Sequence, residues 1–598
     1  MASPSVILQR AENYVSVAVL ILMSLLPVVE VVSREWLGGG VPGSIPIVQH
    51  MTMWIAFLGA ALAARSDRLL ALSTASFLSE RWREPVKIGT AILAVAITVL
   101  LGVASVQLVQ VDRSYGDIAA WGLPIWLFTV VMPISFGLIS VRLILHGSNT
   151  TKGRLVASLG VFVAAIVWLI PAPPDPGLIA ALGAILVVAT AFGMPIYAAV
   201  GGAALLLFWG EGTPISAVPG EAYRMSTSPM LPAIPLFTLA GYILAQGGSS
   251  KRLLNLFSAC VGWMPGGLAI VVTLVLAFFT PLTGASGVTI LAMGGLILPM
   301  LVKANYTESN SLGLVTVSGS IGVLFPPSLP VILYAYYAEL NLDQLFIAGV
   351  VPGVLLVVMV AAWGAWTGAR QGAERSAFDG RQLLIALWKA RFEVLLPIMI
   401  LTSIFGGFAT LVEASALTVL YALLVECLIF KELHWRRDIA RVAAESATMI
   451  GGFMIILSVA LGLTNYLIIA QIPMHVLDWV QTVIESPYVF LLMLNVLLIV
   501  VGALMDIYSA IIVLVPLIAP MASAYGIHPV HLGIVFLANM QLGYLMPPMG
   551  ENLFLSAYRF DKPLVELYKC VLPYVGILLI AVLIITYIPA LTLWLLPS

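Results

Sequence analysis

The sequence predicts an all-α membrane protein that crosses the bilayer many times, with two re-entrant hairpins and an inverted repeat in its larger part. Only 9% of the 598 residues are charged, whereas 61% are hydrophobic and the mean hydropathy is +1.08. Soluble domains contain about 25% charged residues, so this composition excludes a soluble globular protein. The formal charge of −1 gives no reason to expect a nucleic acid partner, and membrane lipid is the expected surrounding.

Apolar segments recur along the whole chain, and most approach the roughly 20 residues that a helix needs to cross a hydrocarbon core of about 30 Å. About fifteen of these segments are expected to be transmembrane helices. They lie at residues 13–32, 50–64, 87–109, 122–141, 155–170, 177–191, 195–210, 230–247, 312–338, 345–368, 393–409, 411–430, 444–470, 530–558 and 570–596.

Two further apolar stretches, 264–302 and 487–524, are interrupted in the middle, and we interpret them as re-entrant hairpins. We place the N-terminus in the cytoplasm and let each hairpin return to the side it entered. All lysines and arginines except Arg34, Arg113 and Arg224 then fall in cytoplasmic loops. This arrangement satisfies the positive-inside rule and places the C-terminus outside the cytoplasm.

The larger part of the chain repeats itself at a fixed spacing. A shift of 221 residues places Gly322 on Gly543, and it places Pro326 on Pro547. Each copy holds an odd number of full spans besides its hairpin, so the second copy is expected to be inverted in the membrane. Inverted repeats are typical of secondary transporters.

Three regions follow from this pattern. Residues 1–145 form a small membrane domain of about four helices, and residues 146–176 supply a connecting helix and linker. Residues 177–598 form the large domain, with repeats at about 177–370 and 391–598.

Amphipathic stretches at 249–262 and 473–485 precede the two hairpins at matching places. Their mixed apolar and charged residues suit helices that lie in the plane of the membrane interface. Such helices could link a stationary part to a mobile part, or they could be connectors without a mechanical role.

Metal and disulfide chemistry are not expected. Cys260, Cys427 and Cys570 all lie in apolar stretches, which indicates neither a disulfide framework nor a metal cluster. His528 and His531 have the spacing of a metal-binding pair, but no further ligand is near them in the sequence.

The sequence also argues against an enzyme. No Gly-x-x-x-x-Gly-Lys-Ser/Thr pattern occurs, which disfavours an ATP-driven pump. Residues 284–287 match the Gly-x-Ser-Gly pattern of rhomboid intramembrane proteases. Such a protease needs a histidine beside the serine, whereas the histidines here fall in loops or interfacial stretches. An intramembrane serine protease is therefore a remote alternative.

Four segments interrupt the predicted helices inside the membrane: the hairpin tips 280–287 and 502–506, and the Pro-Pro segments 322–328 and 543–550. Backbone in a bilayer stays helical unless it is buried in protein or lines a wet cavity. Paired prolines remove N–H donors and unwind a helix, which would leave carbonyl oxygens without an internal partner. Carbonyl oxygens and hydroxyl groups together suit Na⁺, which broken helices hold in other transporters.

Each tip and its matching break therefore predict one sodium site, with Na⁺ as the coupling ion and no other metal or cofactor. The alternative at each site is a simple proline kink that neighbouring helices satisfy. The expected sodium-binding residues are Thr283, Gly284, Ser286, Gly322, Leu324, Pro326, Gly502, Asp506, Gly543 and Met546.

The substrate is expected between the two tips near the midplane, where helix N-termini favour an anion. No lysine or arginine occurs within the four interrupted segments, so hydroxyls, an amide and helix ends would carry recognition. The expected substrate-binding residues are Thr283, Ser286, Pro327, Ser328, Asp506 and Asn552.

Two acidic residues, Asp506 and Glu413, allow the alternative that protons are the coupling ion. Asp506 lies deep in an apolar stretch, where a carboxylate is costly and usually functional. It could ligate the cation, bind a substrate hydroxyl or carry a proton. Glu413 lies at a helix break, where it could be functional or could cap a helix N-terminus. A proton-coupled permease that uses Asp506 or Glu413 is therefore the alternative to sodium coupling.

These residues resemble the membrane component of the tripartite ATP-independent periplasmic (TRAP) transporters, in the form where the small and large membrane subunits are fused. In 1–145 the resemblance rests on Phe-Leu-Gly-Ala-Ala-Leu-Ala-Ala-Arg at 57–65. In 177–598 it rests on Thr-Gly-Ala-Ser at 283–286, Gly-Val-Leu-Phe-Pro-Pro-Ser at 322–328, Ala-Thr-Leu-Val-Glu-Ala at 409–414 and Gly-Tyr-Leu-Met-Pro-Pro-Met-Gly at 543–550.

The resemblance implies sodium-driven secondary active uptake by an elevator mechanism. It also implies that a separate periplasmic substrate-binding protein delivers a small organic anion, such as a carboxylate or sulfonate. The implied location is the bacterial cytoplasmic (inner) membrane, with the N-terminus in the cytoplasm and the C-terminus in the periplasm.

Overall fold

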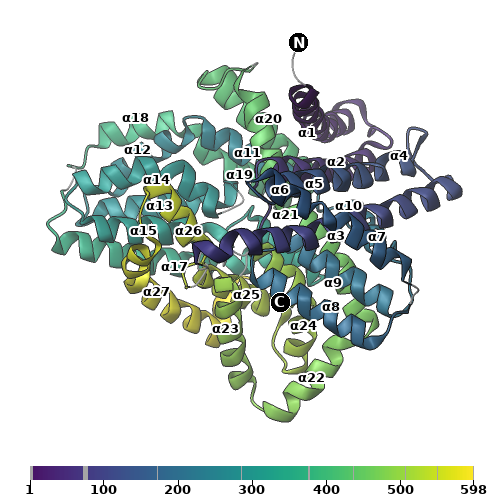
Figure 1. Cartoon of the computed structure of the whole chain (residues 1–598). Coiled ribbons are helices and arrows are strands. Elements are labelled where there is room, and N and C mark those ends of the chain that lie inside the picture. Colours follow the sequence, from purple (N-terminus) through teal and green to yellow (C-terminus); the bar gives the residue numbers. More distant parts are fainter. Residues whose placement is uncertain are drawn as a thin grey trace. The chain divides into compact units, whose positions relative to one another are not determined.

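The computed structural model describes residues 4–71, 79–170, 173–283, 286–374, 377–435, 437–504, 507–547 and 550–596. These residues are almost entirely helical (Figure 1). The only paired strands among the described ranges are β1 (Ile118–Ala120) and β2 (Leu123–Pro124), which form a short antiparallel hairpin.

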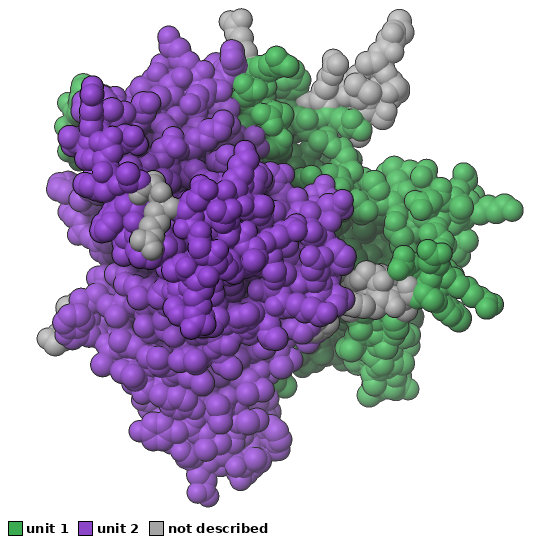
Figure 2. All heavy atoms as spheres, turned by 90° about the vertical axis from the view of Figure 1, so that its left-hand side faces the viewer, with its two compact units in different colours: residues 1–239, 436–472 green, residues 240–435, 473–598 purple. Residues whose placement is uncertain are grey.

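The helices form two compact units (Figure 2). Unit 1 comprises residues 1–239 and 436–472, and unit 2 comprises residues 240–435 and 473–598. The helices of unit 1 are α1 (Pro4–Leu37), α2 (Ser44–Arg65), α3 (Glu80–Tyr115), α4 (Ile125–Thr129), α5 (Val131–His146), α6 (Thr151–Ala157), α7 (Leu159–Leu169), α8 (Pro176–Ala191), α9 (Ile196–Gly210), α10 (Ala217–Ser226) and α21 (Asp438–Ile469).

Helix α11 (Ala233–Gln246) leads from unit 1 into unit 2 along the chain. The elements of unit 2 are α12 (Ser249–Val261), α13 (Gly267–Thr283), α14 (Ser286–Lys303), α15 (Glu308–Ile321), the 3₁₀ turn η2 (Gly322–Leu324), α16 (Leu329–Tyr337), α17 (Leu342–Arg370), α18 (Gly380–Lys389), α19 (Arg391–Phe405), α20 (Leu411–Leu423), the π-helical segment η3 (Leu424–Ile429), α22 (Ile472–Val483), α23 (Pro487–Leu504), α24 (Ile507–Ala524), α25 (Pro529–Gly543), α26 (Glu551–Phe560), α27 (Leu564–Tyr587) and α28 (Ala590–Leu593).

Many helices are long and apolar enough to cross a membrane. Within the described ranges there are 11, or up to 12 if the bent pair 308–324 and 329–337 is one span. Several shorter apolar helices occur as well, among them α8, α9 and α25. A multi-span helical protein is thus confirmed, while the count of about fifteen spans and the re-entry of the two hairpins stay predictions.

The helix bounds of unit 2 recur at the spacing that the sequence suggested. Helices α15 and α25 begin at Glu308 and Pro529, which are 221 residues apart. Helices α17 and α27 begin at Leu342 and Leu564, which are 222 residues apart. Matching helices therefore begin at nearly the same spacing in both copies, and the opposite orientation of the copies in the membrane stays a prediction.

The run of small residues in α2 permits very close helix packing within unit 1. A Cβ atom placed on Gly451 of α21 would lie 1.9 Å from the carbonyl carbon of Gly59. A Cβ atom placed on Gly59 would lie 2.2 Å from the carbonyl oxygen of Ala447. Small residues allow helix backbones to approach in this way in membranes. Unit 1 accordingly joins the predicted small domain to α8–α10 and α21 from the predicted large domain.

Candidate functional site

A small cavity within unit 2 brings together both hairpins and both helix breaks. Its volume is about 10 Å³, which is about one water-sized sphere. Its lining contains no lysine or arginine, and it combines hydroxyl groups, apolar side chains and one carboxylate. The lining residues are Thr280, Ser286, Val323, Ser328, Pro330, Ile507, Tyr508, Tyr544 and Glu551.

Two helices begin at this cavity. Glu551 is the first residue of α26, and Ser328 is the N-cap residue of α16. Ser286 of α14 and Ile507 of α24 line the cavity as well. The first N–H groups of a helix have no intrahelical partner, and the helix dipole makes that end partly positive. The two helix ends favour negative charge in the cavity, whereas the Glu551 carboxylate in its lining favours a cation.

The first break separates α15 from α16. The two helical parts, 308–324 and 329–337, are bent by 44° relative to each other, and the peptide bond between Pro326 and Pro327 is cis. The hydroxyl of Ser328 is buried and has no hydrogen-bond partner among the described residues. Because a buried hydroxyl without a partner costs free energy, Ser328 is a strong candidate for contact with a bound ion or substrate.

The backbone carbonyls in the two breaks are better satisfied than the sequence suggested. The carbonyl oxygen of Gly322 accepts a hydrogen bond from the Phe325 N–H at 3.0 Å, and that of Gly543 accepts one from Met546 at 2.9 Å. The Met546 carbonyl accepts one from Gly550 at 3.0 Å. The expectation of carbonyls without an internal partner is wrong at these three residues, because the chain forms tight turns after each helix. Each oxygen keeps a second lone pair, so sodium contacts there stay a prediction.

Glycines let each hairpin pack directly on the backbone of its matching break. A Cβ atom on Gly322 would lie 2.4 Å from the carbonyl oxygen of Ala277 in α13. A Cβ atom on Gly543 would lie 2.6 Å from the Cα atom of Gly502 in α23. The predicted sodium residues Gly322, Gly502 and Gly543 are therefore also required by packing. Val323 and Tyr544, which directly follow Gly322 and Gly543, line the cavity.

Ser286 and Asn552 connect the first hairpin to the helix after the second break. The Ser286 hydroxyl donates a hydrogen bond to Asn552 Oδ1 at 2.8 Å. On the second hairpin, the N–H of Ile507 donates to the Tyr544 hydroxyl at 2.7 Å. These contacts hold both tips against α26 and the second break, which is the arrangement expected for a site shared by the two repeats.

The remaining predicted residues occupy different places. Thr283 bonds within its own hairpin, where its hydroxyl lies 2.7 Å from that of Thr289. Thr283, Leu324, Pro326, Pro327 and Met546 lie in or beside the interrupted segments but do not line the cavity. Gly284 and Asp506 lie outside the described residues.

The sequence reasoning missed several lining residues. Thr280, Tyr508 and Tyr544 line the cavity, and the Thr280 hydroxyl donates to the Gly319 carbonyl at 2.9 Å. A signal for Tyr544 was present, since it directly follows Gly543 in the predicted break. Thr280 lies in the predicted tip 280–287, so a signal for it was present too. Tyr508 was harder to find, because its contact depends on how the second hairpin folds back on the breaks.

Glu413 and the two histidines have structural partners. Thr410 and Glu413 form a capping box at the start of α20, in which Glu413 Oε2 accepts from the Thr410 N–H at 2.8 Å. The capping interpretation of Glu413 is thus confirmed. His528 caps α25, and the Nδ1 atom of His531 lies 2.8 Å from the Thr592 hydroxyl. No group of three or more potential metal ligands occurs among the residues that the structure describes.

Two protein-family models match the chain. Residues 183–591 match the tripartite ATP-independent periplasmic transporter, DctM component, and residues 23–151 match the DctQ component of the same transporters. The chain belongs to the TRAP transporter family. It is a fusion of the two membrane components, as its resemblance to the family implied.

Relatives of this TRAP permease are named after several different substrates. The isethionate TRAP transporter permease protein DctMQ of Oleidesulfovibrio alaskensis is 30% identical, covering 92% of this chain and 87% of the relative. The C4-dicarboxylate TRAP transporter large permease protein DctM of Pseudomonas aeruginosa is 33% identical, covering 66% of this chain and 92% of the relative. The ectoine TRAP transporter large permease protein TeaC of Halomonas elongata is 31% identical, covering 61% of this chain and 85% of the relative.

These relatives are named transporter permeases, so the TRAP chain is a transporter component and not an enzyme. The site agrees with this conclusion. The serine of the protease-like pattern, Ser286, is bonded to the amide of Asn552 and not to a histidine. An amide oxygen cannot take the serine proton as a general base does, and nothing supports the protease alternative.

Proposed function

We propose that this TRAP permease performs sodium-coupled secondary active uptake of a small organic anion, a carboxylate or a sulfonate, that a separate periplasmic binding protein delivers. The observation that carries this proposal is that both hairpins, both breaks and the N-termini of α16 and α26 meet at one cavity in unit 2. The names of the relatives support the substrate class, since isethionate is a sulfonate and C4-dicarboxylates are carboxylates.

The lining of the cavity carries groups that suit an anion and groups that suit a cation, while its volume in this structure is about one water-sized sphere. Helix N-termini bind carboxylate, sulfate and phosphate groups through free N–H groups and the helix dipole. The Glu551 carboxylate and the hydroxyls of Ser286 and Ser328 offer oxygen atoms, which are the ligands that hard cations prefer. A cation bound beside the anion would offset its charge. Each species would then raise the affinity for the other, and this reciprocal effect is the basis of coupling.

The energy for uptake would come from the sodium gradient. Each monovalent cation that enters down the membrane potential releases about 2.3 kcal/mol per 100 mV, besides its concentration term. We propose an elevator motion in which the hairpins and breaks move as one body. Unit 2 holds all four of these segments, and the helices α12 and α22 precede the hairpins at matching positions.

Replacement of sodium tests the proposed coupling. The purified permease is reconstituted in proteoliposomes with its cognate binding protein, and uptake of isethionate and of C4-dicarboxylates is measured at fixed pH and fixed membrane potential. Uptake should require an inward Na⁺ gradient and the binding protein, and it should stop when external Na⁺ is replaced by K⁺. Uptake that persists in K⁺ and follows an imposed pH gradient would instead favour the proton-coupled alternative.

The buried hydroxyl of Ser328 gives a second test. A hydrogen bond to a charged group contributes about 1.5–3 kcal/mol, so Ser328→Ala should raise the half-saturating concentration of substrate or Na⁺ about tenfold or more. Ser320→Ala is the matched control, because the Ser320 hydroxyl donates to the Val317 carbonyl within its own helix. Equal half-saturating concentrations in the two variants would show that the Ser328 hydroxyl does not bind substrate or Na⁺.

A further inference from the structure

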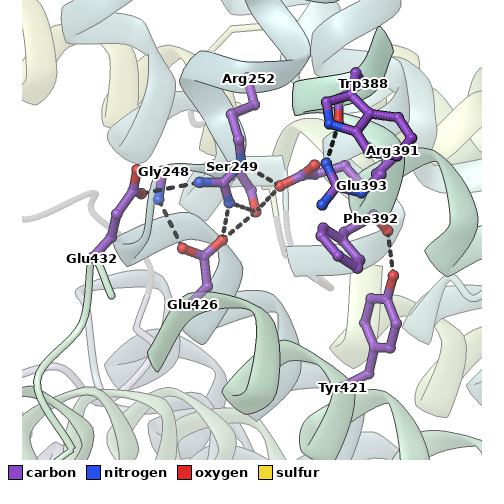
Figure 3. Close-up of polar contacts among 10 residues, drawn as sticks. All are labelled: Gly248, Ser249, Arg252, Trp388, Arg391, Phe392, Glu393, Tyr421, Glu426 and Glu432. Carbon is purple, nitrogen blue, oxygen red and sulfur yellow. Dashed lines mark hydrogen bonds and ion pairs between the residues drawn. The ribbon is translucent and has the colours of Figure 1, made fainter. Parts of the chain in front are cut away.

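A buried ion cluster lies apart from the cavity at the start of α12 (Figure 3). Arg252 of α12 contacts carboxylates from α19, from η3 and from the segment that follows η3. Its Nε atom lies 2.5 Å from Glu393 Oε1, its Nη2 atom contacts Glu426 Oε1, and its Nη1 atom lies 3.2 Å from Glu432 Oε2. Arg252, Glu393 and Glu426 are buried, whereas the Glu432 side chain is 43% exposed.

The cluster contains more carboxylates than cations. One guanidinium contacts three carboxyl groups. Of the neighbouring charged groups, Arg391 stacks on the rings of Trp388 and Phe392 at 4.3 Å. The side chains of Lys251, Lys431 and His434 are exposed, and the Tyr421 hydroxyl donates to the Phe392 carbonyl at 2.9 Å. Buried charges need compensation by partners, so a single arginine leaves negative charge to be neutralised.

The hydroxyl of Ser249 lies between Glu426 and Glu393 and has too few protons to donate to both. Its oxygen lies 2.6 Å from Glu426 Oε1 and 3.1 Å from Glu393 Oε1. A serine hydroxyl has one proton to donate, so it can satisfy one of these two carboxylate oxygens. Both oxygens also contact the same guanidinium, so the two carboxylates are neighbours.

The remaining partners divide unequally between Glu393 and Glu426. Glu426 accepts from Arg252 and from the Ser249 hydroxyl, and its Oε2 atom accepts from the Gly248 N–H at 3.1 Å. Glu393 accepts from Arg252, but its Oε2 atom is buried and has no hydrogen-bond partner among the described residues. Donors stabilise an ionised carboxylate, and a neighbouring carboxylate disfavours a second negative charge.

We propose that Glu393 and Glu426 share one proton and form a proton-binding site that anchors α12 to α19 and η3. Glu432, whose half-exposed carboxylate contacts Arg252 Nη1, marks the exposed edge of the cluster. With the proton bound, one arginine balances one buried carboxylate. When the proton leaves, two neighbouring buried carboxylates repel each other, and the anchor of α12 weakens. The anchor is therefore strongest at low pH and weakens as pH rises on the side that Glu432 faces.

Infrared spectroscopy of the whole protein in lipid tests this site without any transport measurement. A protonated buried carboxyl has a C=O stretching band that is separate from those of carboxylates and amides and that shifts in D₂O. The wild-type protein should show such a band, and the band should disappear in Glu393→Gln and in Glu426→Gln. Glu432→Gln is the matched control, because it changes the exposed member of the same cluster, and there the band should remain.

A pH titration of the infrared band in the wild-type protein tests the site even if the variants do not fold. The band should decrease reversibly as pH rises, and the protection of α12 amides, taken relative to their intrinsic exchange rate at each pH, should decrease over the same pH range. Absence of a titrating band in the wild-type protein, or its retention in both buried Gln variants, would overturn the proposal. A band that disappears equally in Glu432→Gln would overturn the assignment of the proton to the buried pair.

Discussion

Arg252→Ala should destabilise the protein by about 3–5 kcal/mol, because removal of one partner from a buried ion cluster leaves uncompensated charge. Arg252 balances Glu393 and Glu426, both of which are buried. The loss should appear as a lower thermal unfolding temperature in lipid or detergent. It should also appear as reduced protection of α12 from hydrogen exchange.

Two variants sharpen this prediction. Arg441→Ala removes an arginine whose side chain is 51% exposed and which pairs with Glu445 and Asp438. Surface pairs contribute about 0–1 kcal/mol, so its unfolding temperature should stay near that of the wild type. The triple variant Arg252→Met, Glu393→Gln and Glu426→Gln removes the buried charges together and should recover most of the lost stability. A triple variant as unstable as Arg252→Ala would contradict the electrostatic explanation.

Gly543→Ala should reduce the uptake rate by about tenfold or more, since added atoms in a well-packed region cost about 1–3 kcal/mol. Its Cβ atom would lie 2.6 Å from the Gly502 Cα atom, so α23 would have to move away from the second break. That movement displaces the hairpin tip that lines the cavity through Ile507 and Tyr508. The initial rate of uptake per folded protein is the appropriate measurement.

The control for Gly543 is Gly576→Ala in α27, where an added Cβ atom would meet no atom within 4 Å. Gly322→Ala should behave like Gly543→Ala, because a Cβ atom there would lie 2.4 Å from the Ala277 carbonyl oxygen. Normal uptake in both break variants would mean that close packing of hairpin on break is not needed for transport.

The comparison of the two breaks shows why the sequence predicted so much of the fold. Proline and glycine act locally on the backbone, and Gly322 and Gly543 mark the ends of matching helices in the two copies. Helices α15 and α25 accordingly begin at Glu308 and Pro529, close to the spacing that was visible in the sequence. The prediction that the breaks would leave free carbonyls was less successful, because turns at Gly322 and Gly543 supply backbone donors.

Polar contacts between distant helices were not predictable in this way. Asn539 of α25 donates to Asn495 of α23 at 2.6 Å, and both side chains are buried. Arg252 meets Glu393 and Glu426, which lie 141 and 174 residues away in the sequence. Each of these residues appears in the sequence as an isolated polar residue. Its partner depends on which helix faces meet, and no local pattern encodes that.

The amino-acid sequence by itself determined the membrane class, the helical repeat, the interrupted segments and the resemblance to TRAP transporters. These features depend on hydropathy and on the backbone properties of glycine and proline, which act over short distances along the chain. Only the tertiary structure decided that both hairpins and both breaks meet at one cavity, and that a single arginine contacts three carboxylates. Those arrangements arise from packing between helices that are far apart in sequence, where burial makes each unpaired charge or hydroxyl costly.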